Sequence, residues 1–306
     1  MIGTALDLVV VALLVAAALA AVGARGLFAG VVFFVGYGVF VAIAWLRLDA
    51  IDVALAEAAI GAGLTGVLLL GAVGHLTRAG AGAPPRRPAI PLALACAGIS
   101  VMLGWAVLSL PDAPGLQAPV AAALPGSGST NPVTSVLLNF RAFDTLLESI
   151  VLLAVLVGVW ALAPDAAWGG RPGLVQRVRP DGVLAGFGRL LPPLGLLVGV
   201  YLVWAGTKQP GGAFQGGTVL AAVWLLASMA GVARAPRVTS LILRAALVAG
   251  PVLFLAVGMA GALGGSFLGL RPDWAAALVL TIEVGLTLSI ASALALLVLG
   301  PPERPA

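Results

Sequence analysis

Nine long apolar stretches dominate the sequence, and they constrain the fold more than any other feature. A helix that crosses a lipid bilayer needs about 20 predominantly apolar residues. The stretches are rich in Leu, Val and Ala, and none shows the alternation of polar and apolar residues that is typical of a membrane β-barrel. They run over residues 3–23, 27–46, 50–74, 89–110, 142–163, 190–206, 214–233, 239–262 and 275–299. The sequence therefore predicts an all-α integral membrane protein with about nine transmembrane helices.

The composition supports a membrane location and excludes several classes of protein. Only 9% of the 306 residues are charged, whereas soluble domains carry about 25%. One cysteine, Cys96, and one histidine, His75, exclude a disulfide framework and a metal site rich in either residue within the chain. No basic–aromatic stripe suggests nucleic-acid binding, and no nucleophile–base–acid set is present. We therefore expect no enzyme activity of its own, no bound cofactor and no nucleic-acid partner.

The positive charges in the loops predict an orientation. Of the sixteen Lys and Arg residues, all but four fall on one side when nine helices cross the bilayer alternately. The four exceptions are Arg47, Arg141, Lys208 and Arg271. Because cytoplasmic loops carry the excess of Lys and Arg, the N-terminus is predicted to lie outside and the C-terminus in the cytoplasm. The expected location is the cell inner (plasma) membrane.

Segments rich in proline and glycine divide the chain into three blocks. The predicted blocks are residues 1–80 with three helices, residues 81–165 with two, and residues 166–306 with four. Within the second block, residues 111–132 carry five prolines and three glycines. Such a segment is predicted to form a largely non-helical outer loop.

Six acidic residues fall within the predicted spans, and they carry most of the functional information. They are Asp7, Asp52, Glu57, Asp144, Glu148 and Glu283. A carboxylate at the centre of a membrane helix costs at least about 2.5 kcal/mol, so it normally has a partner or a function. On the predicted topology all six lie in the outer half of the bilayer or near its midplane.

The spacing of Asp144 and Glu148 points both side chains to one helix face. Two acids on one buried face would share a proton or bind a cation between them. A structural interpretation, in which the acids cap helices or bond to neighbouring helices, is also open. It applies above all to Asp7, Asp52 and Asp144, because the helix dipole favours an acid in the first turn.

We therefore expect an ion route for Na⁺ or H⁺ that opens to the outside and is lined by acidic residues. The residues assigned to it are Asp52, Glu57, Asp144, Glu148 and Glu283. Apart from Arg244, near the cytoplasmic end of its stretch, no Lys or Arg lies inside a predicted span, and the inner half holds almost no titratable group except His75. The chain is thus expected to contribute half a pathway and to depend on partner subunits for the rest.

A second signal is the short outer turn between the sixth and seventh apolar stretches. Its residues are Pro210, Gly211, Gly212, Phe214, Gln215, Gly216 and Gly217. Glycine permits positive φ angles and close approach of backbones. A nucleotide-binding loop is disfavoured because no strand precedes the turn and no Gly-Lys-Ser/Thr ending follows. The spacing indicates a structural turn that holds two helices close together.

Three segments resemble subunits of one group of membrane complexes. Residues 52–64 (DVALAEAAIGAGL) look like the signature of the MbhD-type subunit. Residues 131–149, from Asn131-Pro132-Val133-Thr134 to Glu148-Ser149, resemble the MbhE-type subunit. The PGGAFQGG turn is similar to the MnhB/MrpB-type subunit of Mrp sodium/proton antiporters. The three follow the order used in Mrp and membrane-bound hydrogenase complexes and together cover nearly the whole chain.

The resemblance implies a fused accessory subunit of an Mrp-type monovalent cation (Na⁺)/proton antiporter. Such a subunit would lie in the lipid bilayer beside other membrane subunits, including large antiporter-like ones, and help to form the sodium route. Asp52, Glu57, Asp144 and Glu148 match acidic positions of the family, and Glu283 matches only loosely. Na⁺ or H⁺ would be the transported ion.

Two departures from the family pattern stand in the turn: Ala213 replaces a usual glycine, and Thr207 stands where a histidine is common. Three alternatives remain beside the antiporter interpretation. The same module could belong to a redox-driven, hydrogenase-like complex, or the chain could be a purely structural scaffold. An independent small transporter or channel is disfavoured by the shortage of titratable groups in the inner half.

Overall fold

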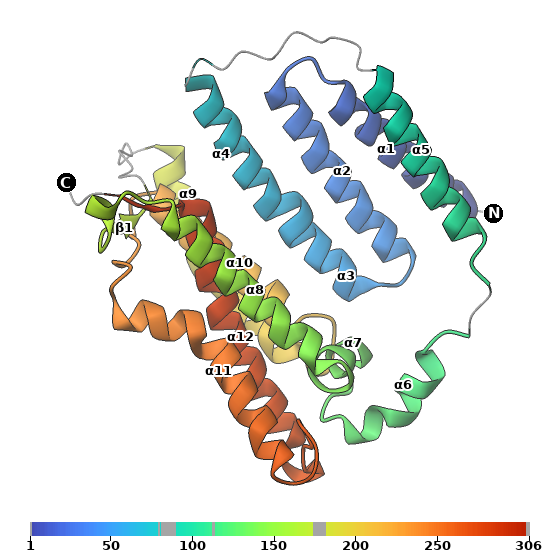
Figure 1. The fold of residues 1–306 in the computed structure, drawn as a ribbon, viewed down its shortest axis with the longest axis vertical. Helices are drawn as coiled ribbons and strands as arrows, with labels where there is room; N and C mark the ends of the chain where they lie inside the picture. The colour runs from blue at the N-terminus through green and yellow to red at the C-terminus, as the bar shows by residue number, and fades with distance from the viewer. Residues whose placement is uncertain (1, 79, 81–89, 112–113, 174–181, 304–306) are drawn as a thin grey trace.

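The computed structural model describes residues 2–78, 80, 90–111, 114–173 and 182–303 of the chain. Its secondary structure is almost entirely helical, with a single pair of two-residue strands among the described residues. Figure 1 shows a bundle of slanted helices, with the N-terminal helices on one side and the C-terminal helices on the other.

The N-terminal block consists of three antiparallel spans. The first two are α1 (Ile2–Gly23) and α2 (Leu27–Arg47). The third runs continuously over Ile51–Arg78. It comprises α3 (Ile51–Ala56), a π-helical segment η1 (Glu57–Leu64) and α4 (Thr65–Arg78). Gly38 of α2 lets Ala62 of η1 approach closely, because a Cβ on Gly38 would lie 3.2 Å from the Ala62 Cα.

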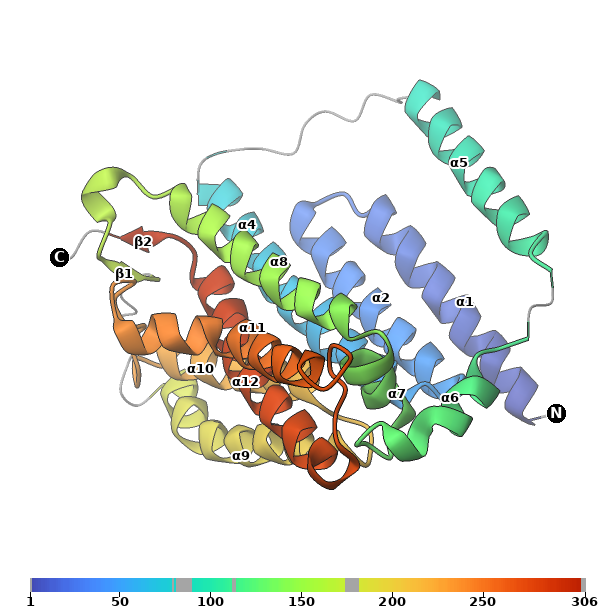
Figure 2. The same cartoon turned by 60° about the horizontal axis from the view of Figure 1, so that its bottom comes forward.

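The middle block begins with α5 (Ile90–Leu108), which buries none of its residues and stands apart from the bundle in Figure 2. Then follow α6 (Gln117–Ala123), η2 (Leu124–Gly126), α7 (Pro132–Ser135), the π-helical η3 (Val136–Phe140) and α8 (Ala142–Ala161). The predicted non-helical character of residues 111–132 is therefore wrong over α6 and η2. Three consecutive alanines favour the helix, and Pro119 lies in its first turn, where proline is tolerated.

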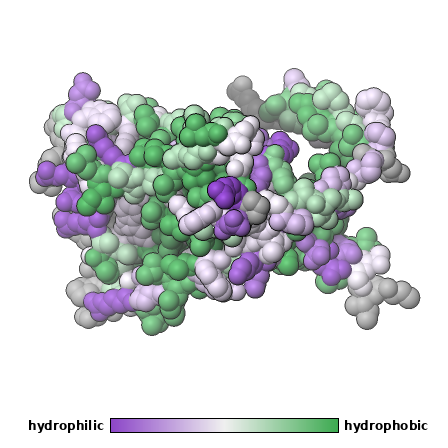
Figure 3. Space-filling view, turned by 90° about the horizontal axis from the view of Figure 1, so that it is seen from below, coloured by the Kyte–Doolittle hydropathy of each residue, from purple (hydrophilic) through white to green (hydrophobic). Residues whose placement is uncertain are grey.

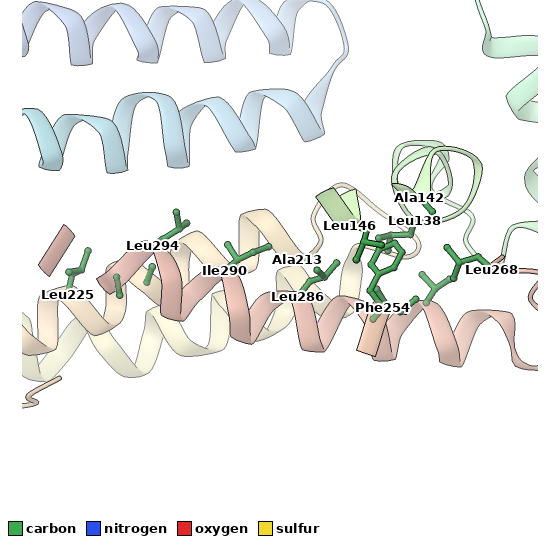
Figure 4. Packing of buried hydrophobic residues seen from close by; sticks show 14 residues of the cluster. Leu138, Ala142, Leu146, Ala213, Leu225, Phe254, Leu268, Leu286, Ile290 and Leu294 are labelled. Atoms are coloured by element: carbon green, nitrogen blue, oxygen red, sulfur yellow. The ribbon is translucent and has the colours of Figure 1, made fainter. Parts of the chain in front are cut away.

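The C-terminal block is built around its last helix. The elements are η4 (Asp165–Ala167), β1 (Arg171–Pro172), α9 (Val183–Ala205), α10 (Ala213–Met229), α11 (Leu241–Ala262), α12 (Pro272–Leu299) and β2 (Pro302–Glu303). Helix α12 packs against α8, α10 and α11 and is the most buried of the spans. Figure 4 shows Leu138 and Leu146 beside Phe254 in this core.

The all-α membrane fold predicted from the sequence is confirmed. Among the described residues, eight helical segments are long and apolar enough to span a membrane, and α10 is a shorter apolar helix of 17 residues. Several boundaries differ from the prediction, among them the start of α9 and the end of α10. Helix α9 begins at Val183 instead of residue 190 and continues through Pro192 and Pro193, which membrane helices tolerate. Helix α10 ends at Met229, shortly before Gly231 with its positive φ of 70°.

The helices run in alternating directions, so their connections gather at two ends of the bundle. We call one the turn end; it holds residues 48–50, 127–135, 206–212 and 263–271. The other is the ribbon end, where the Val238 N–H donates to the Gly170 carbonyl oxygen at 3.1 Å and β1 pairs with β2. Apolar side chains cover much of the surface between polar groups in Figure 3, as expected for helices that face lipid or apolar protein. Charge asymmetry alone predicts that the turn end faces outside.

Candidate functional site

The glycine-rich turn between α9 and α10 lies at the centre of the turn end. Gly211 and Gly212 have φ angles of 153° and 116°, which favour glycine. A Cβ on Gly211 would lie 2.5 Å from the Leu202 carbonyl oxygen, while the Gly212 N–H donates to that oxygen at 2.9 Å. The turn therefore folds back tightly onto the last residues of α9.

The remaining motif residues pack the start of α10 between two neighbours. A Cβ on Gly216 would lie 2.9 Å from the Gly199 carbonyl oxygen of α9, and one on Gly217 would lie 2.8 Å from the Ile290 side chain of α12. Phe214 packs against the hydrophobic core, and Pro210 is half-buried at the start of the motif. The geometry accounts for a small residue at both glycine positions.

A polar loop from the middle block, residues 127–135, docks onto this turn. Ser129 Oγ donates to the Thr207 carbonyl oxygen at 2.6 Å, and Thr134 Oγ1 donates to the Gly206 carbonyl oxygen at 2.6 Å. The backbone N–H groups of Thr130 and Asn131 also donate to the Thr207 carbonyl oxygen. These buried bonds satisfy carbonyl groups that the turn leaves without helical partners.

Asn131 makes the most contacts in this loop. Its Nδ2 donates to the carbonyl oxygens of Gly206 and Gln209, at 3.2 and 3.0 Å. Its Oδ1 accepts the Val133 N–H at 2.9 Å and so caps α7. Sequence reasoning missed this role, although Asn followed by Pro is a recognisable helix start.

Replacing Asn131 with alanine is expected to destabilise the protein by about 2–4 kcal/mol. The substitution removes the cap and leaves the carbonyl oxygens of Gly206 and Gln209 without that donor. Thermal unfolding of the purified protein in detergent measures the effect. Gln117→Ala in the exposed helix α6 is the control, because Gln117 is exposed and its loss should change the stability by less than about 0.5 kcal/mol. Equal melting temperatures for the two variants would contradict the role of Asn131.

Asp52 connects the N-terminal block to the same turn. Its Oδ1 accepts the Gly211 N–H at 2.9 Å, and the Asp52 carbonyl oxygen accepts a hydrogen bond from Gln215 Nε2 at 3.2 Å. Asp52 lies in the first turn of α3 and is only 8% exposed. One turn thus receives the polar loop of the middle block and the first turn of α3.

Glu283 of α12 also lies against the turn and is only 2% exposed. Its Oε1 is 3.0 Å from the position of a Cβ on Gly206 and 3.2 Å from that of a Cβ on Gly212. Its Oε2 is buried and has no hydrogen-bond partner among the described residues. An unpaired carboxylate in such a place is costly unless a proton or cation neutralises it.

Glu57 stands at the beginning of the π-helical segment η1 and is half-buried. Its carboxylate folds back over Gly61, where a Cβ would collide with it. Because Gly61 has no Cβ, it leaves room for the Glu57 carboxylate in this position. Short π-helical segments are frequent at functional sites in helices.

The remaining acids lie on the surface of the chain. Asp144 and Glu148 share one face of α8, as their spacing predicts, but both are exposed in the single chain. Asp144 pairs with Arg141 at 2.6 Å, and Asp7 pairs with Arg47 at 2.7 Å. The structure therefore brings Asp52 and Glu283 to one turn and leaves Asp144 and Glu148 facing away from the core. Their exposure was not evident from the sequence, because α8 presents apolar residues on several sides.

Comparisons with known proteins give three family matches in one chain. Residues 12–78 match the MbhD family and residues 86–165 match the MbhE family, both of which are families of MBH subunits. Residues 183–301 match the MnhB family, "Domain related to MnhB subunit of Na+/H+ antiporter". Asp52 lies in the first region, Asn131 in the second, and the glycine-rich turn with Glu283 in the third. The turn end is thus the meeting point of all three regions.

Two solved structures are similar in fold. The Mrp complex from Dietzia sp. DQ12-45-1b matches with a TM-score of 0.75 and 26% identity over 97% of this chain and 35% of that chain. This chain therefore spans about a third of the length of the Mrp chain. The membrane-bound sulfane sulfur reductase, an archaeal respiratory membrane complex, matches with a TM-score of 0.54 and 22% identity. That match covers 69% of this chain and 99% of the other. No curated protein matches the sequence significantly.

Proposed function

Because the chain belongs to the Mrp/MBH type of membrane subunits, with MbhD, MbhE and MnhB domains in one polypeptide, we propose that it is an accessory subunit of an Mrp-type antiporter. The complex would exchange a monovalent cation, Na⁺, for protons across the cell inner membrane. This chain would act as a transporter subunit without a catalytic site or a bound cofactor. Its acidic residues would form part of the ion route.

One observation carries the proposal: three domains meet at a turn flanked by two buried carboxylates. The Gly211 N–H holds Asp52, and Glu283 lies beside Gly212 with one oxygen unpaired among the described residues. A purely structural acid would be expected to have hydrogen-bond donors. A carboxylate that is visited by a cation or proton needs an available oxygen, which Glu283 has.

Exposed groups on the middle block support the presence of partner subunits. Glu148 is exposed on the side of α8, and a carboxylate that faces lipid within a span is costly. Helix α5 is apolar and buries none of its residues. We therefore propose that other membrane subunits, including large antiporter-like ones, cover Glu148 and complete the inner half of the route.

Replacing Glu148 with glutamine is expected to lower Na⁺/H⁺ exchange by at least about tenfold, because a carboxylate that relays protons typically contributes more than this. Assembly should be unchanged, since Glu148 makes no hydrogen bond or ion pair within the described part of the chain. Dye-monitored exchange in inverted vesicles measures the effect, and recovery of the intact complex measures assembly. Asp273→Asn, an equal charge change at the exposed start of α12, is the control. Unchanged exchange in Glu148→Gln would remove this residue from the route.

The second candidate is the same module within a redox-driven complex. The two MBH family matches favour it, and the fold is also found in the sulfane sulfur reductase complex. Mass spectrometry of the co-purifying subunits separates the two candidates. Iron–sulfur or nickel–iron partners would select the redox-driven complex, and a set of antiporter-like subunits without them would select the antiporter.

A further inference from the structure

The missing side chain of Gly212 leaves a space edged by two oxygen atoms. A Cβ there would lie 3.2 Å from Glu283 Oε1 and 3.6 Å from Gln215 Oε1. The side chains come from α12 and from the first turn of α10. The space is therefore lined by a carboxylate and an amide oxygen, and the positive φ of Gly212 keeps a larger residue out of it.

Three hydrogen-bond donors near this space have other acceptors. The Gly211 N–H donates to Asp52 Oδ1, the Gly212 N–H to the Leu202 carbonyl oxygen, and Gln215 Nε2 to the Asp52 carbonyl oxygen. The last bond turns the amide donor of Gln215 toward α3 and leaves its oxygen available. The space thus adjoins a buried carboxylate whose Oε2 has no donor among the described residues.

No basic side chain forms a salt bridge with Glu283 among the described residues. Asp52 on α3 adds a second negative charge close to the turn. Lys208 in the turn and the pair Asp144 and Glu148 on α8 are exposed. Arg244 of α11 lies at the ribbon end, where it donates to the Val238 carbonyl oxygen. Helix α10 carries no charged residue.

We propose that Glu283, Gln215 and Asp52 form a binding site for one Na⁺-like monovalent cation, which exchanges with a proton on Glu283. Hard cations prefer carboxylate and carbonyl oxygens, and the ligands would come from the first and third domains. When Na⁺ enters, the proton leaves Glu283, and the net charge of the site does not change. The role of this exchange in transport rests on the proposed antiporter function.

The test is Na⁺-linked proton release from the purified, assembled complex in weakly buffered detergent solution. Sodium chloride is added against choline chloride, and a pH indicator and ²²Na⁺ binding are read together. Wild-type complex is expected to release about one more proton and bind about one more Na⁺ per chain than Glu283→Gln, because cation binding to a protonated ligand releases its proton. Asp273→Asn, with the same charge change outside the site, should behave as wild type.

Gln215→Leu provides a second variant that keeps the charge of the site. Loss of one oxygen ligand is expected to weaken Na⁺ binding by about tenfold, while saturating Na⁺ still releases the proton. Full proton release in Glu283→Gln would overturn the site. If Glu283→Gln does not assemble, wild-type Na⁺ affinity in Gln215→Leu would overturn it instead. Loss of release in Glu283→Gln, together with a wild-type complex that exchanges no Na⁺ in vesicles, would support the site and reject the antiporter function.

Discussion

Replacing Gly211 with alanine is expected to destabilise the assembled protein by about 2–5 kcal/mol. The added Cβ would lie 2.5 Å from the Leu202 carbonyl oxygen, a backbone atom that cannot move freely. Overpacking of this kind costs about 1–3 kcal/mol, and a φ of 153° adds strain of about the same size for a residue other than glycine. The Gly211 N–H would also lose its alignment with Asp52, so the effect should reach the contact between the first and third domains.

Thermal unfolding in detergent and the yield of intact complex measure this effect. Gly158→Ala is the matched control, because Gly158 lies within helix α8 and a Cβ there would meet nothing within 4 Å. Alanine should be neutral or slightly stabilising at that position. A Gly211→Ala protein as stable as Gly158→Ala would show that the turn tolerates a different backbone path.

Two substitutions of Asp52 distinguish a role of this residue in ion transport from a purely structural role. Asp52→Asn keeps an oxygen that can accept the Gly211 N–H but removes the negative charge, so assembly should be retained. If the carboxylate takes part in the ion route, exchange in vesicles should fall by at least about tenfold. Asp52→Leu removes the acceptor as well, and the buried N–H left without a partner should cost about 1–3 kcal/mol.

The two substitutions are compared by exchange rate per assembled complex. Low exchange in Asp52→Asn with normal assembly supports a role in the route. Normal exchange in Asp52→Asn with weakened assembly in Asp52→Leu would assign Asp52 to structure alone. Asp165→Asn at the ribbon end, where Asp165 is exposed, controls for the change in charge.

The helices could be predicted from the sequence because their length and apolar character are properties of single segments. The expected stretches at 3–23 and 142–163 agree with α1 and α8 to within two residues. The start of α9 was predicted less well, since Pro192 and Pro193 and the nearby Arg189 suggest a later beginning than Val183. A short helix such as α6 is also hard to predict in a segment with five prolines.

The candidate site was predicted only in part, because it depends on contacts between distant segments. Sequence spacing correctly places Asp144 and Glu148 on one face of α8, but it does not tell which way the face points. The hydrogen bond between Asp52 and Gly211, 159 positions apart, leaves no local sequence pattern. The resemblance of three motifs to three kinds of subunit identified the segments that carry Asp52, Asn131 and the glycine-rich turn. The sequence does not show that these segments meet, because their contact depends on the fold.

The short ribbon of β1 and β2 has a consequence for how the C-terminal domain is connected. Pairing of Arg171 with Glu303 puts the points where the chain enters and leaves that four-helix domain side by side on one face of the bundle. A domain with adjacent ends can be made as a separate polypeptide, or inserted into a longer one, without moving its helices. Fusion and fission of the gene at this point would therefore leave the packing of the transmembrane core intact.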